Sequence, residues 1–173
     1  LGGGTPKTTI DEYWNGSIPF FTPKDVQGTY ILTTEKTLTE AGLKNCSSQL
    51  YPTNTVFVTA RGTVGKLAMA GVPMAMNQSC YALIGKFGYG QHFVYHLAHE
   101  MVANLKHKAS GAVFDAIVTR DFDSEVVAIP SQNVVSKFEN IVKPIYEAIL
   151  NNTNESLGLS ILRDSLLPRL MSG

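Results

Sequence analysis

Hydrophobic residues in the last quarter of the chain recur every seven positions, which sets this segment apart from the rest. The repeat contains Phe138, Ile145, Leu159 and Leu166, with Ile141, Ala148 and Leu162 at the companion positions. Such a heptad repeat keeps one apolar edge of a helix turned toward a partner helix. A continuous helix over the 43 residues from 131 to 173 would be roughly 60 Å long, more than the width of a domain of this size. We therefore predict a spacer or docking arm whose apolar edge is covered by another helix.

The heptad repeat has one polar position, Asn152, inside the Asn-Asn-Thr-Asn cluster at 151–154. Judged locally, this cluster and Gly158 indicate a turn between two shorter helices. The phase of the repeat favours one helix over residues 131–171, because its positions stay seven residues apart across the cluster. A single Asn at such a position also fixes the register of paired helices. Pro144 is expected to kink the helix, at a cost of about 3 kcal/mol that burial of neighbouring isoleucines offsets.

Shorter apolar runs before residue 131 predict strands and helices in no regular order. β-Branched and aromatic residues predict a strand at 55–59, and further strands are predicted at 66–70, 79–84, 112–117 and 126–129. A short helix closed by Gly42 is predicted at 39–43, and helical spacing predicts a helix at 93–105. Residues 13–26 mix aromatics with Asn-Gly and two prolines, which indicates short extended pieces joined by turns. The irregular order favours an α+β class over a doubly wound α/β sheet. We expect a small mixed domain over residues 1–130 and the helical arm over 131–173, with Ser131 as its N-cap.

Length and composition allow one core of ordinary size plus the arm. The 173 residues are 44% hydrophobic, and no apolar run approaches the roughly 20 residues that span a bilayer. The chain carries no signal peptide and begins at Leu1 rather than Met, so we expect a trimmed or excised sequence. Cys46 and Cys80 form no CxxC pair and are interpreted as reduced core thiols of a cytoplasmic protein.

Charge is balanced over the whole chain but not along it. The formal net charge is zero, which by itself argues against a nucleic-acid ligand. Residues 61–108 nevertheless carry five basic side chains (Arg61, Lys66, Lys86, Lys106 and Lys108) against the single acid Glu100. Residues 109–173 carry five basic and eight acidic side chains. A basic middle followed by an acidic tail permits an anionic ligand on one face, with ordinary surface scatter as the alternative interpretation.

Two glycine-containing strings look like nucleotide-binding loops but do not meet the requirements. The string RGTVGK at 61–66 has two residues between its glycines where a phosphate loop needs four, and Leu67 follows the lysine. We interpret it as a tight hairpin that presents Arg61 and Lys66 side by side, suited to a phosphate backbone. The string GKFGYG at 85–90 has no acidic partner about 20 residues further on, so we interpret it as a glycine-rich loop before a helix.

No catalytic or metal-binding arrangement is recognisable in the sequence. His92, His96 and His99 share a helix face, but the order is not HExxH and no Cys or carboxylate lies at ligand spacing. We expect these histidines at a helix surface near DNA or solvent. Asp121 and Asp123 lie two apart in a predicted turn, where solvated acids are common. The sequence therefore predicts neither a metal, a cofactor nor an enzymatic activity.

Several segments, taken in order, resemble the DNA-specificity subunit of type I restriction–modification systems. They are GGTPK (3–7), YWNGSIPFFTPKDV (13–26), ARGTVGK (60–66), NQSCYAL (77–83), SGAVFDAI (110–117) and RDSLLPRLMSG (163–173). The resemblance implies a mixed target-recognition domain followed by a long helix, and a full subunit with two such units whose helices pack antiparallel between two DNA half-sites. It also implies that the helices dock the methyltransferase subunits, through which the restriction subunit joins. This chain holds one unit, so it is either half of a longer subunit or a natural half-subunit that pairs with itself.

The resemblance leads to residue-level expectations for double-stranded DNA and for a partner helix. Phosphate contacts are expected from Lys7, Arg61, Lys66, Lys106 and Lys108, and contacts nearer base edges from Lys24, Thr63, Asn77 and Gln78. The partner-helix interface is expected at Phe138, Ile141, Ile145, Asn152, Leu159, Leu162 and Leu166. Two other classes of protein compete with this interpretation. An adenine methyltransferase or nuclease fragment would need an NPPY-like or carboxylate motif, which the sequence lacks, whereas a protein–protein adaptor that uses the arm without nucleic acid stays open.

Overall fold

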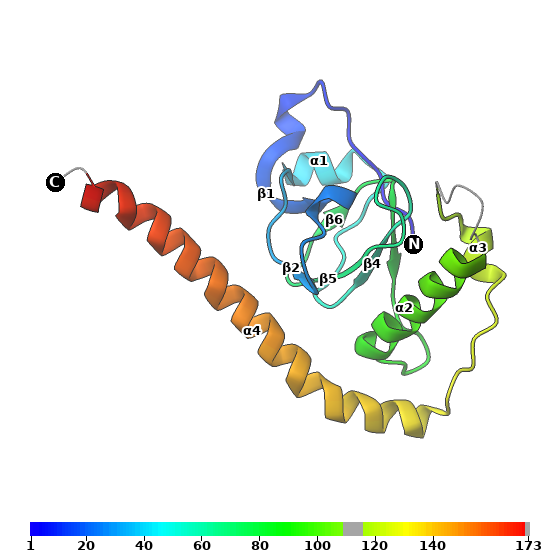
Figure 1. Ribbon diagram of the computed structural model, residues 1–173. Helices are drawn as coiled ribbons and strands as arrows, with labels where there is room; N and C mark the ends of the chain where they lie inside the picture. The colour runs from blue at the N-terminus through cyan, green and yellow to red at the C-terminus, as the bar shows by residue number, and fades with distance from the viewer. Residues whose placement is uncertain (109–115, 172–173) are drawn as a thin grey trace.

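Two small β-sheets form the centre of the first part of the chain in a computed structural model that describes residues 1–108 and 116–171 (Figure 1). One sheet has the strand order β2-β5-β4-β7, and the other has the order β3-β1-β6. The strands are β1 (Trp14–Phe21), β2 (Tyr30–Ile31), β3 (Thr37–Leu38), β4 (Val56–Thr59), β5 (Leu67–Ala70), β6 (Ala75–Met76) and β7 (Cys80–Leu83). The pairs β1–β6 and β2–β5 are parallel, and the pairs β1–β3, β4–β5 and β4–β7 are antiparallel.

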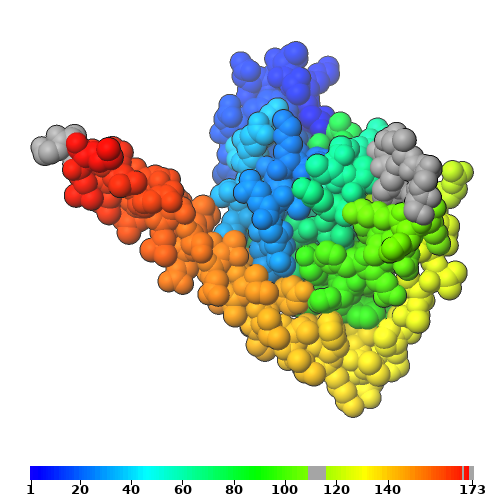
Figure 2. All heavy atoms as spheres, viewed as in Figure 1, coloured from blue at the N-terminus to red at the C-terminus, as the bar shows by residue number. Residues whose placement is uncertain are grey.

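Helices cover one side of the four-stranded sheet and continue into a projecting arm (Figure 1). The helical elements are η1 (Asp11–Tyr13), η2 (Pro23–Asp25), α1 (Glu40–Lys44), α2 (Gln91–Lys108), α3 (Thr119–Asp123) and α4 (Gln132–Met171). The long helix α2 and the first half of α4 pack on the domain, whereas the second half of α4 extends away from it (Figure 2). A small mixed-sheet domain followed by a long C-terminal helix confirms the predicted α+β class.

The four-stranded sheet is the middle layer of the domain, because its central strands are buried on both faces. Val56 and Val58 of β4 point toward α2, where Tyr95 lies in the same cluster. Phe57 points the opposite way and stacks on Phe21 with ring centroids 4.7 Å apart. Side chains alternate faces along a strand, so the continuous apolar run in β4 reflects apolar layers on both sides.

The long helix α4 is a single uninterrupted element of 40 residues, which confirms the one-helix prediction. The polar cluster at 151–154 does not break it, because two of its side chains hydrogen-bond to carbonyls one turn earlier. Thr153 Oγ1 donates to the Ile149 carbonyl at 2.7 Å, and Asn154 Nδ2 donates to the Leu150 carbonyl at 3.0 Å. Such bonds are compatible with a helix and bend it slightly. Pro144 stays inside the helix, and Figure 1 shows α4 bending along its first half.

Most of the predicted short elements are present with small shifts at their ends. Strands predicted at 55–59, 66–70 and 79–84 correspond to β4, β5 and β7, and helices predicted at 39–43 and 93–105 correspond to α1 and α2. Of the strand predicted at 112–117, residues 112–115 lie outside the described residues. Ala116 forms an isolated bridge with Arg61, and the Ile117 amide donates to the Ala60 carbonyl at 2.9 Å.

Three local predictions were wrong. Residues 13–26 were expected as short extended pieces joined by turns, but β1 runs through Pro19 as one strand. Its pairing with β3 shifts register beside Asn15, which adopts φ 61°. Residues 126–129 are not a strand but a connection between α3 and α4, with Val126 94% exposed. A β-branched run forms a strand only where a neighbouring edge offers hydrogen bonds. Asp121 and Asp123 belong to α3 rather than to a turn.

Both cysteines are free thiols, as predicted. Cys80 is 1% exposed, and burial raises the pKa of its thiol to about 12, with the Asp25 carboxylate adding to the shift. A thiol with so high a pKa stays protonated and unreactive near neutral pH. Within the described ranges, no helix is long and apolar enough to cross a membrane.

Two buried threonines of the β4 region should respond oppositely to valine substitution. Thr55 Oγ1 is buried without a hydrogen-bond partner among the described residues, so Thr55→Val should leave the free energy of unfolding unchanged or raise it by up to about 1 kcal/mol. Thr59 Oγ1 donates to the Thr63 carbonyl and accepts from the Lys66 amide at 2.9 Å, so Thr59→Val should lower it by about 1–3 kcal/mol. Urea unfolding of both variants measures the difference, and equal losses would contradict it.

Candidate nucleic-acid interface

Loops from five parts of the sequence meet around a cavity of about 420 Å³. They are the N-terminal segment, the η2 turn, the loop between β2 and β3, the loop between β4 and β5, and the turn between β6 and β7. The lining residues are Thr5, Thr8, Trp14, Phe20, Thr22, Pro23, Lys24, Glu35, Lys36, Arg61, Gly62, Asn77 and Ser79. Three cations and one acid lie among them. The cavity therefore combines positive charge with amide and hydroxyl groups, which suits a polar anion.

A buried carboxylate organises the η2 turn that carries Lys24. Asp25 Oδ2 accepts hydrogen bonds from the Thr22 amide and hydroxyl, both at 2.7 Å, which forms a capping box. Its Oδ1 accepts from the Glu35 amide at 2.9 Å, which ties the turn to the next lining segment. Our sequence prediction did not include Asp25, although the Thr-Pro-Lys-Asp string carries the capping-box spacing that could have identified it.

The β4–β5 loop holds Arg61 and Lys66 at its two ends, and both side chains are exposed. Gly62 and Gly65 adopt φ of 79° and 72°, a region that only glycine enters at no steric cost. The loop is anchored to η2 because Thr63 Oγ1 donates to the Pro23 carbonyl at 3.2 Å. It is anchored to α2 because Lys106 Nζ donates to the Gly65 carbonyl at 3.2 Å. The predicted hairpin is present, and it lies between the two elements that carry Lys24 and Lys106.

The turn after β6 places two amide side chains beside the N-terminal segment. Asn77 Oδ1 accepts from the Ser79 amide at 3.0 Å, so this side chain also shapes the turn. Gln78 is exposed, and its Oε1 accepts a hydrogen bond from Thr5 Oγ1. Thr5 therefore orients the Gln78 amide group. Of the two amides, Gln78 is the freer candidate for contact with a base edge.

Two residues that sequence reasoning did not single out contribute to the rim of this cavity, which includes Lys24, Lys36, Arg61 and Asn77. Lys36 Nζ lies 5.5 Å from the centroid of the Trp14 ring, and Trp14 Nε1 donates to the Lys7 carbonyl at 3.3 Å. Trp14 thus connects the segment carrying Lys7 to the lining cation Lys36. A cation above an aromatic face is held in place by the ring quadrupole. The signal was present only as isolated residue types, because their proximity depends on the pairing of β1 with β3.

The nine predicted DNA-binding residues divide into those that line the cavity, those on adjoining segments, and Lys108. Lys24, Arg61 and Asn77 line the cavity itself. Thr63, Lys66, Gln78, Lys106 and Lys7 lie on the adjoining segments described above. Lys108 differs, because its ammonium forms an ion pair at 2.6 Å with Glu125, whose side chain is buried. A buried carboxylate needs this partner, so Lys108 has less freedom to contact a phosphate.

The histidine face of α2 lies toward α4. His92 is buried and lies 2.7 Å from Glu139 of α4, and His96 Nε2 lies 2.9 Å from the Tyr146 hydroxyl of α4. The expectation of histidines at a surface near DNA or solvent is therefore wrong for His92, and His96, although exposed, is engaged by the arm. Within residues 1–108 and 116–171, no group of three His, Cys, Asp or Glu side chains could hold a metal ion.

The predicted partner-helix residues lie mainly on a face of α4 that its own domain leaves uncovered. Ile141, Ile145, Asn152, Leu159, Leu162 and Leu166 are all exposed in this chain. The domain instead contacts Val142, Tyr146 and Ile149. Ile145 precedes Tyr146, so the two side chains project about 100° apart around the helix axis. Phe138 is an exception, because its half-buried ring lies against His96 and Phe93 of the same chain.

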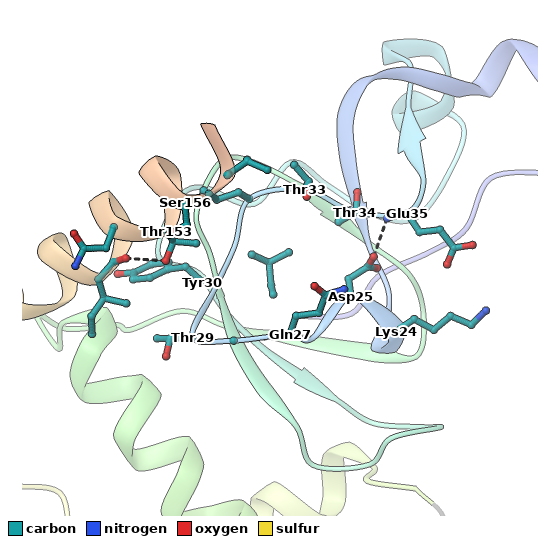
Figure 3. A pocket seen from close by; sticks show the side chains of 16 residues that line it. Lys24, Asp25, Gln27, Thr29, Tyr30, Thr33, Thr34, Glu35, Thr153 and Ser156 are labelled. Carbon is teal, nitrogen blue, oxygen red and sulfur yellow. Dashed lines mark hydrogen bonds between the residues drawn. The ribbon is translucent and has the colours of Figure 1, made fainter. Parts of the chain in front are cut away.

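A second, larger cavity of about 870 Å³ lies between α4 and the segment that follows η2 (Figure 3). Thr153 and Ser156 lie on the α4 side of the cavity, and Gln27 and Thr29 lie on the segment that follows η2, whereas the Tyr30 ring of that segment reaches toward α4. Asn152 also lines this cavity. The groove therefore borders the uncovered face of α4 at the point where the helix leaves the domain.

Comparison with known protein families assigns the chain to one family. The family described as "Type I restriction modification DNA specificity domain" matches residues 1–158 of the chain. The chain belongs to this family. The match confirms the resemblance that the sequence motifs indicated.

Similar proteins are specificity subunits of type I restriction enzymes. The chain is 31% identical over 160 residues to the MjaIX specificity subunit of Methanocaldococcus jannaschii. This alignment covers 90% of this chain and 37% of that protein. It is 29% identical over 175 residues to the HindI specificity subunit of Haemophilus influenzae, which covers 99% of this chain and 38% of that protein. The chain thus spans less than half the length of these relatives.

Solved structures show the same fold at low sequence identity. The HsdS subunit from Thermoanaerobacter tengcongensis matches with a TM-score of 0.61 and 16% identity, over 88% of this chain and 36% of that chain. A chain from a structural study of complex assembly in the type I R-M system matches with a TM-score of 0.58 and 17% identity, over 98% of this chain and 42% of that chain. Both support the assignment of the mixed domain and its long helix.

Proposed function

We propose that this specificity-family chain reads one half of a bipartite double-stranded DNA target for a type I restriction–modification complex. The observation that carries the proposal is the cavity rim, where Lys24, Lys36 and Arg61 lie together with Asn77. Cations fix a protein on the phosphate backbone, and amide groups discriminate between bases at the groove edges. The rim offers both groups on loops from one end of the domain. In this role the chain has no catalytic activity of its own and needs no cofactor.

The arm is the second part of the proposal, with residues 1–130 as the recognition domain and 131–173 as the arm. We propose that its uncovered face packs against a matching helix, either from a second recognition unit in a longer polypeptide or from a second copy of this chain. The same arm would dock the methyltransferase subunit, and the restriction subunit would join through that subunit. This part is supported by the exposed heptad positions and by the relatives, which are more than twice as long as the chain.

Replacing Lys66 tests the phosphate contacts directly. Lys66→Ala should weaken binding to every duplex sequence and reduce the slope of log affinity against log salt by about one unit, because one released counterion accounts for about 0.9 of that slope. Fluorescence anisotropy of labelled duplexes at several salt concentrations gives both quantities. Lys137→Ala on α4 is the matched control, since Lys137 is exposed and lies outside the rim. It should leave the slope unchanged.

The same measurement separates the proposal from the adaptor alternative, in which the arm acts without nucleic acid. Salt-dependent binding by the wild-type chain supports DNA recognition, whereas no binding at low salt would favour the adaptor. An unchanged slope for Lys66→Ala in a chain that binds DNA would remove this side chain from the interface and leave the rim residues Lys24, Lys36 and Arg61 to be tested.

A further inference from the structure

The base of the arm is held to the domain by polar contacts concentrated at one end of α2. The glycine-rich loop before α2 takes part in these contacts. Gln132 Nε2 of α4 donates a hydrogen bond to the Phe87 carbonyl, and the Tyr89 hydroxyl donates one to the Pro130 carbonyl at 3.3 Å. An apolar contact between two helices permits small rotations and slips. Hydrogen bonds with defined directions fix one arrangement, and here they cluster within the first turns of α4.

Glu139 supplies the central contact of this group. Its Oε1 accepts from the Phe93 amide at 2.8 Å, and its Oε2 lies 2.7 Å from His92 Nδ1. Helix α2 begins at Gln91, so the Phe93 amide is one of the first-turn N–H groups that have no partner within their own helix. The carboxylate of α4 therefore caps α2 and pairs with its buried histidine at the same time. Both side chains are largely shielded from water, at 17% and 8% exposure.

Gly90 provides the space for this carboxylate. A Cβ atom at position 90 would lie 2.2 Å from both Cδ and Oε1 of Glu139, closer than any real contact. A side chain at this position would push the Glu139 carboxylate, the flexible end of its side chain, away from the end of α2. This explains a glycine at the end of the GKFGYG string that no nucleotide-binding role required.

A second contact lies two turns further along the arm and prevents α4 from pivoting about Glu139. The Tyr146 hydroxyl lies 2.9 Å from His96 Nε2, and the Tyr146 ring stacks on His92 at 4.6 Å. Tyr146 also meets Tyr30 of β2 edge to face at 6.4 Å. Two contact points separated along one helix define its direction, whereas a single point would not.

We propose that Glu139 is a positioning residue that fixes the direction of the arm relative to the recognition domain and thereby the separation of the two DNA half-sites. The effect on the separation of the half-sites rests on the proposed function, whereas the direction of the arm rests only on the contacts described above. About 20 residues of α4 lie beyond Leu150, roughly 30 Å of helix. A rotation of about 10° at the base would move the tip by roughly 5 Å, more than the 3.4 Å between adjacent base pairs along one DNA strand.

Distances between spin labels on the domain and on the arm test the proposal. Labels at Gln49→Cys and Ser165→Cys, in a Cys46→Ser background, report the direction of α4, and dilution with unlabelled chain restricts the signal to distances within one chain. Wild type should give one narrow distribution by pulsed electron paramagnetic resonance. Glu139→Ala should broaden it or shift it by about 5 Å, as the lever length requires. Glu155→Ala, an exposed carboxylate on the same helix, should not change it.

Two conservative variants distinguish the reach of the side chain from its charge. Glu139→Gln keeps the length and an oxygen that accepts from the Phe93 amide, so the wild-type distribution should return. Glu139→Asp keeps the charge but falls one methylene short, so it should resemble Glu139→Ala. Gly90→Ala should displace the arm with Glu139 intact, and adding Glu139→Ala to it should produce no further change, because both substitutions remove the same contact. This pair keeps the test informative if one single variant folds poorly.

DNA binding supplies the functional readout and keeps two failures distinguishable. In a paired assembly, Glu139→Ala should keep the affinity for an isolated half-site within about twofold, because the rim is untouched. It should reduce the preference for one spacer length by at least about tenfold, because the direction of the arm is no longer fixed. Unchanged label distances in Glu139→Ala would overturn the positioning role whatever the chain binds. Shifted distances in a chain that binds no DNA would uphold the positioning of the arm and overturn the proposed function instead.

Discussion

Replacing Leu159, Leu162 and Leu166 with alanine should abolish the proposed pairing of two chains and leave a monomer at micromolar concentration. All three side chains are more than 40% exposed in the single chain, so they contribute little to the fold of the domain. Each would lose about 1.5–3 kcal/mol of burial in a paired arm, which for three positions is roughly 4–9 kcal/mol per arm. Alanine preserves helix propensity, so α4 itself should persist. Sedimentation velocity measures the change.

The position of Asn152 indicates how two copies would pair. It lies midway between Phe138 and Leu166, and midway between Ile145 and Leu159. In an antiparallel pair about this midpoint, each Asn152 would face its counterpart, so the two amides satisfy each other. Asn152→Leu should then strengthen association while admitting other registers.

An exposed aliphatic residue on another side of α4 provides the control. Ile161 is 62% exposed and lies outside the heptad positions, so Ile161→Ala should leave the sedimentation coefficient unchanged. Equal dissociation by Ile161→Ala would place the interface elsewhere on the helix. A wild-type chain that is monomeric throughout the micromolar range would contradict self-pairing and leave a second unit of a longer polypeptide as the partner.

The arm was predictable because its signal is periodic over many residues. A loop has no reason to preserve a seven-residue phase, so the register from Phe138 to Leu166 outweighed the local turn signal at 151–154. Sequence alone did not reveal that α4 presents a second apolar face to its own domain through Val142 and Tyr146. The face that packs on the domain is continuous with the heptad face around the helix, and only the position of α2 distinguishes the two faces.

Short elements were predictable where the sequence pattern coincided with a neighbouring strand. They were not predictable where no neighbouring strand was available for pairing. β4 is rich in β-branched and aromatic residues, β5 is wholly hydrophobic, and each pairs with a strand on both of its edges. Residues 126–129 have a similar composition, but they cross the surface between α3 and α4 without a paired edge. The histidines of α2 show the same limit, because the burial of His92 beside Glu139 and the contact of His96 with Tyr146 depend on residues about 50 positions further along the chain.

The candidate interface was predictable in its residue types but not in its connections. Cations and amides in loops pointed to Arg61, Lys66 and Gln78, all of which lie at or beside the rim. The partners that hold the rim together, Asp25 and Trp14, act through hydrogen bonds and a ring contact between distant segments. Lys108 shows the converse, because its charge was visible in the sequence while its ion pair with Glu125 was not.

Gln78→Ala should reduce sequence discrimination without weakening the general attraction to DNA. The side chain is exposed, its Oε1 is oriented by Thr5, and an amide that bonds a base edge with both its groups contributes about 1–3 kcal/mol to discrimination. We therefore expect affinity for the preferred half-site to fall about 5- to 150-fold, with affinity for unrelated duplexes nearly unchanged. Selection from a randomised duplex pool with the wild-type chain defines the preferred half-site first.

Three comparisons make the result specific to base readout. Gln49→Ala removes an exposed amide on another loop, away from the cavity lining, and should change neither affinity. Thr5→Val removes the group that orients Gln78 and should produce a smaller loss of discrimination in the same direction. Lys66→Ala should lower both affinities together, since a phosphate carries no sequence information. If Gln78→Ala also lowered both affinities in parallel, Gln78 would contact the backbone, and the discrimination would have to come from Asn77 or from the shape of the DNA.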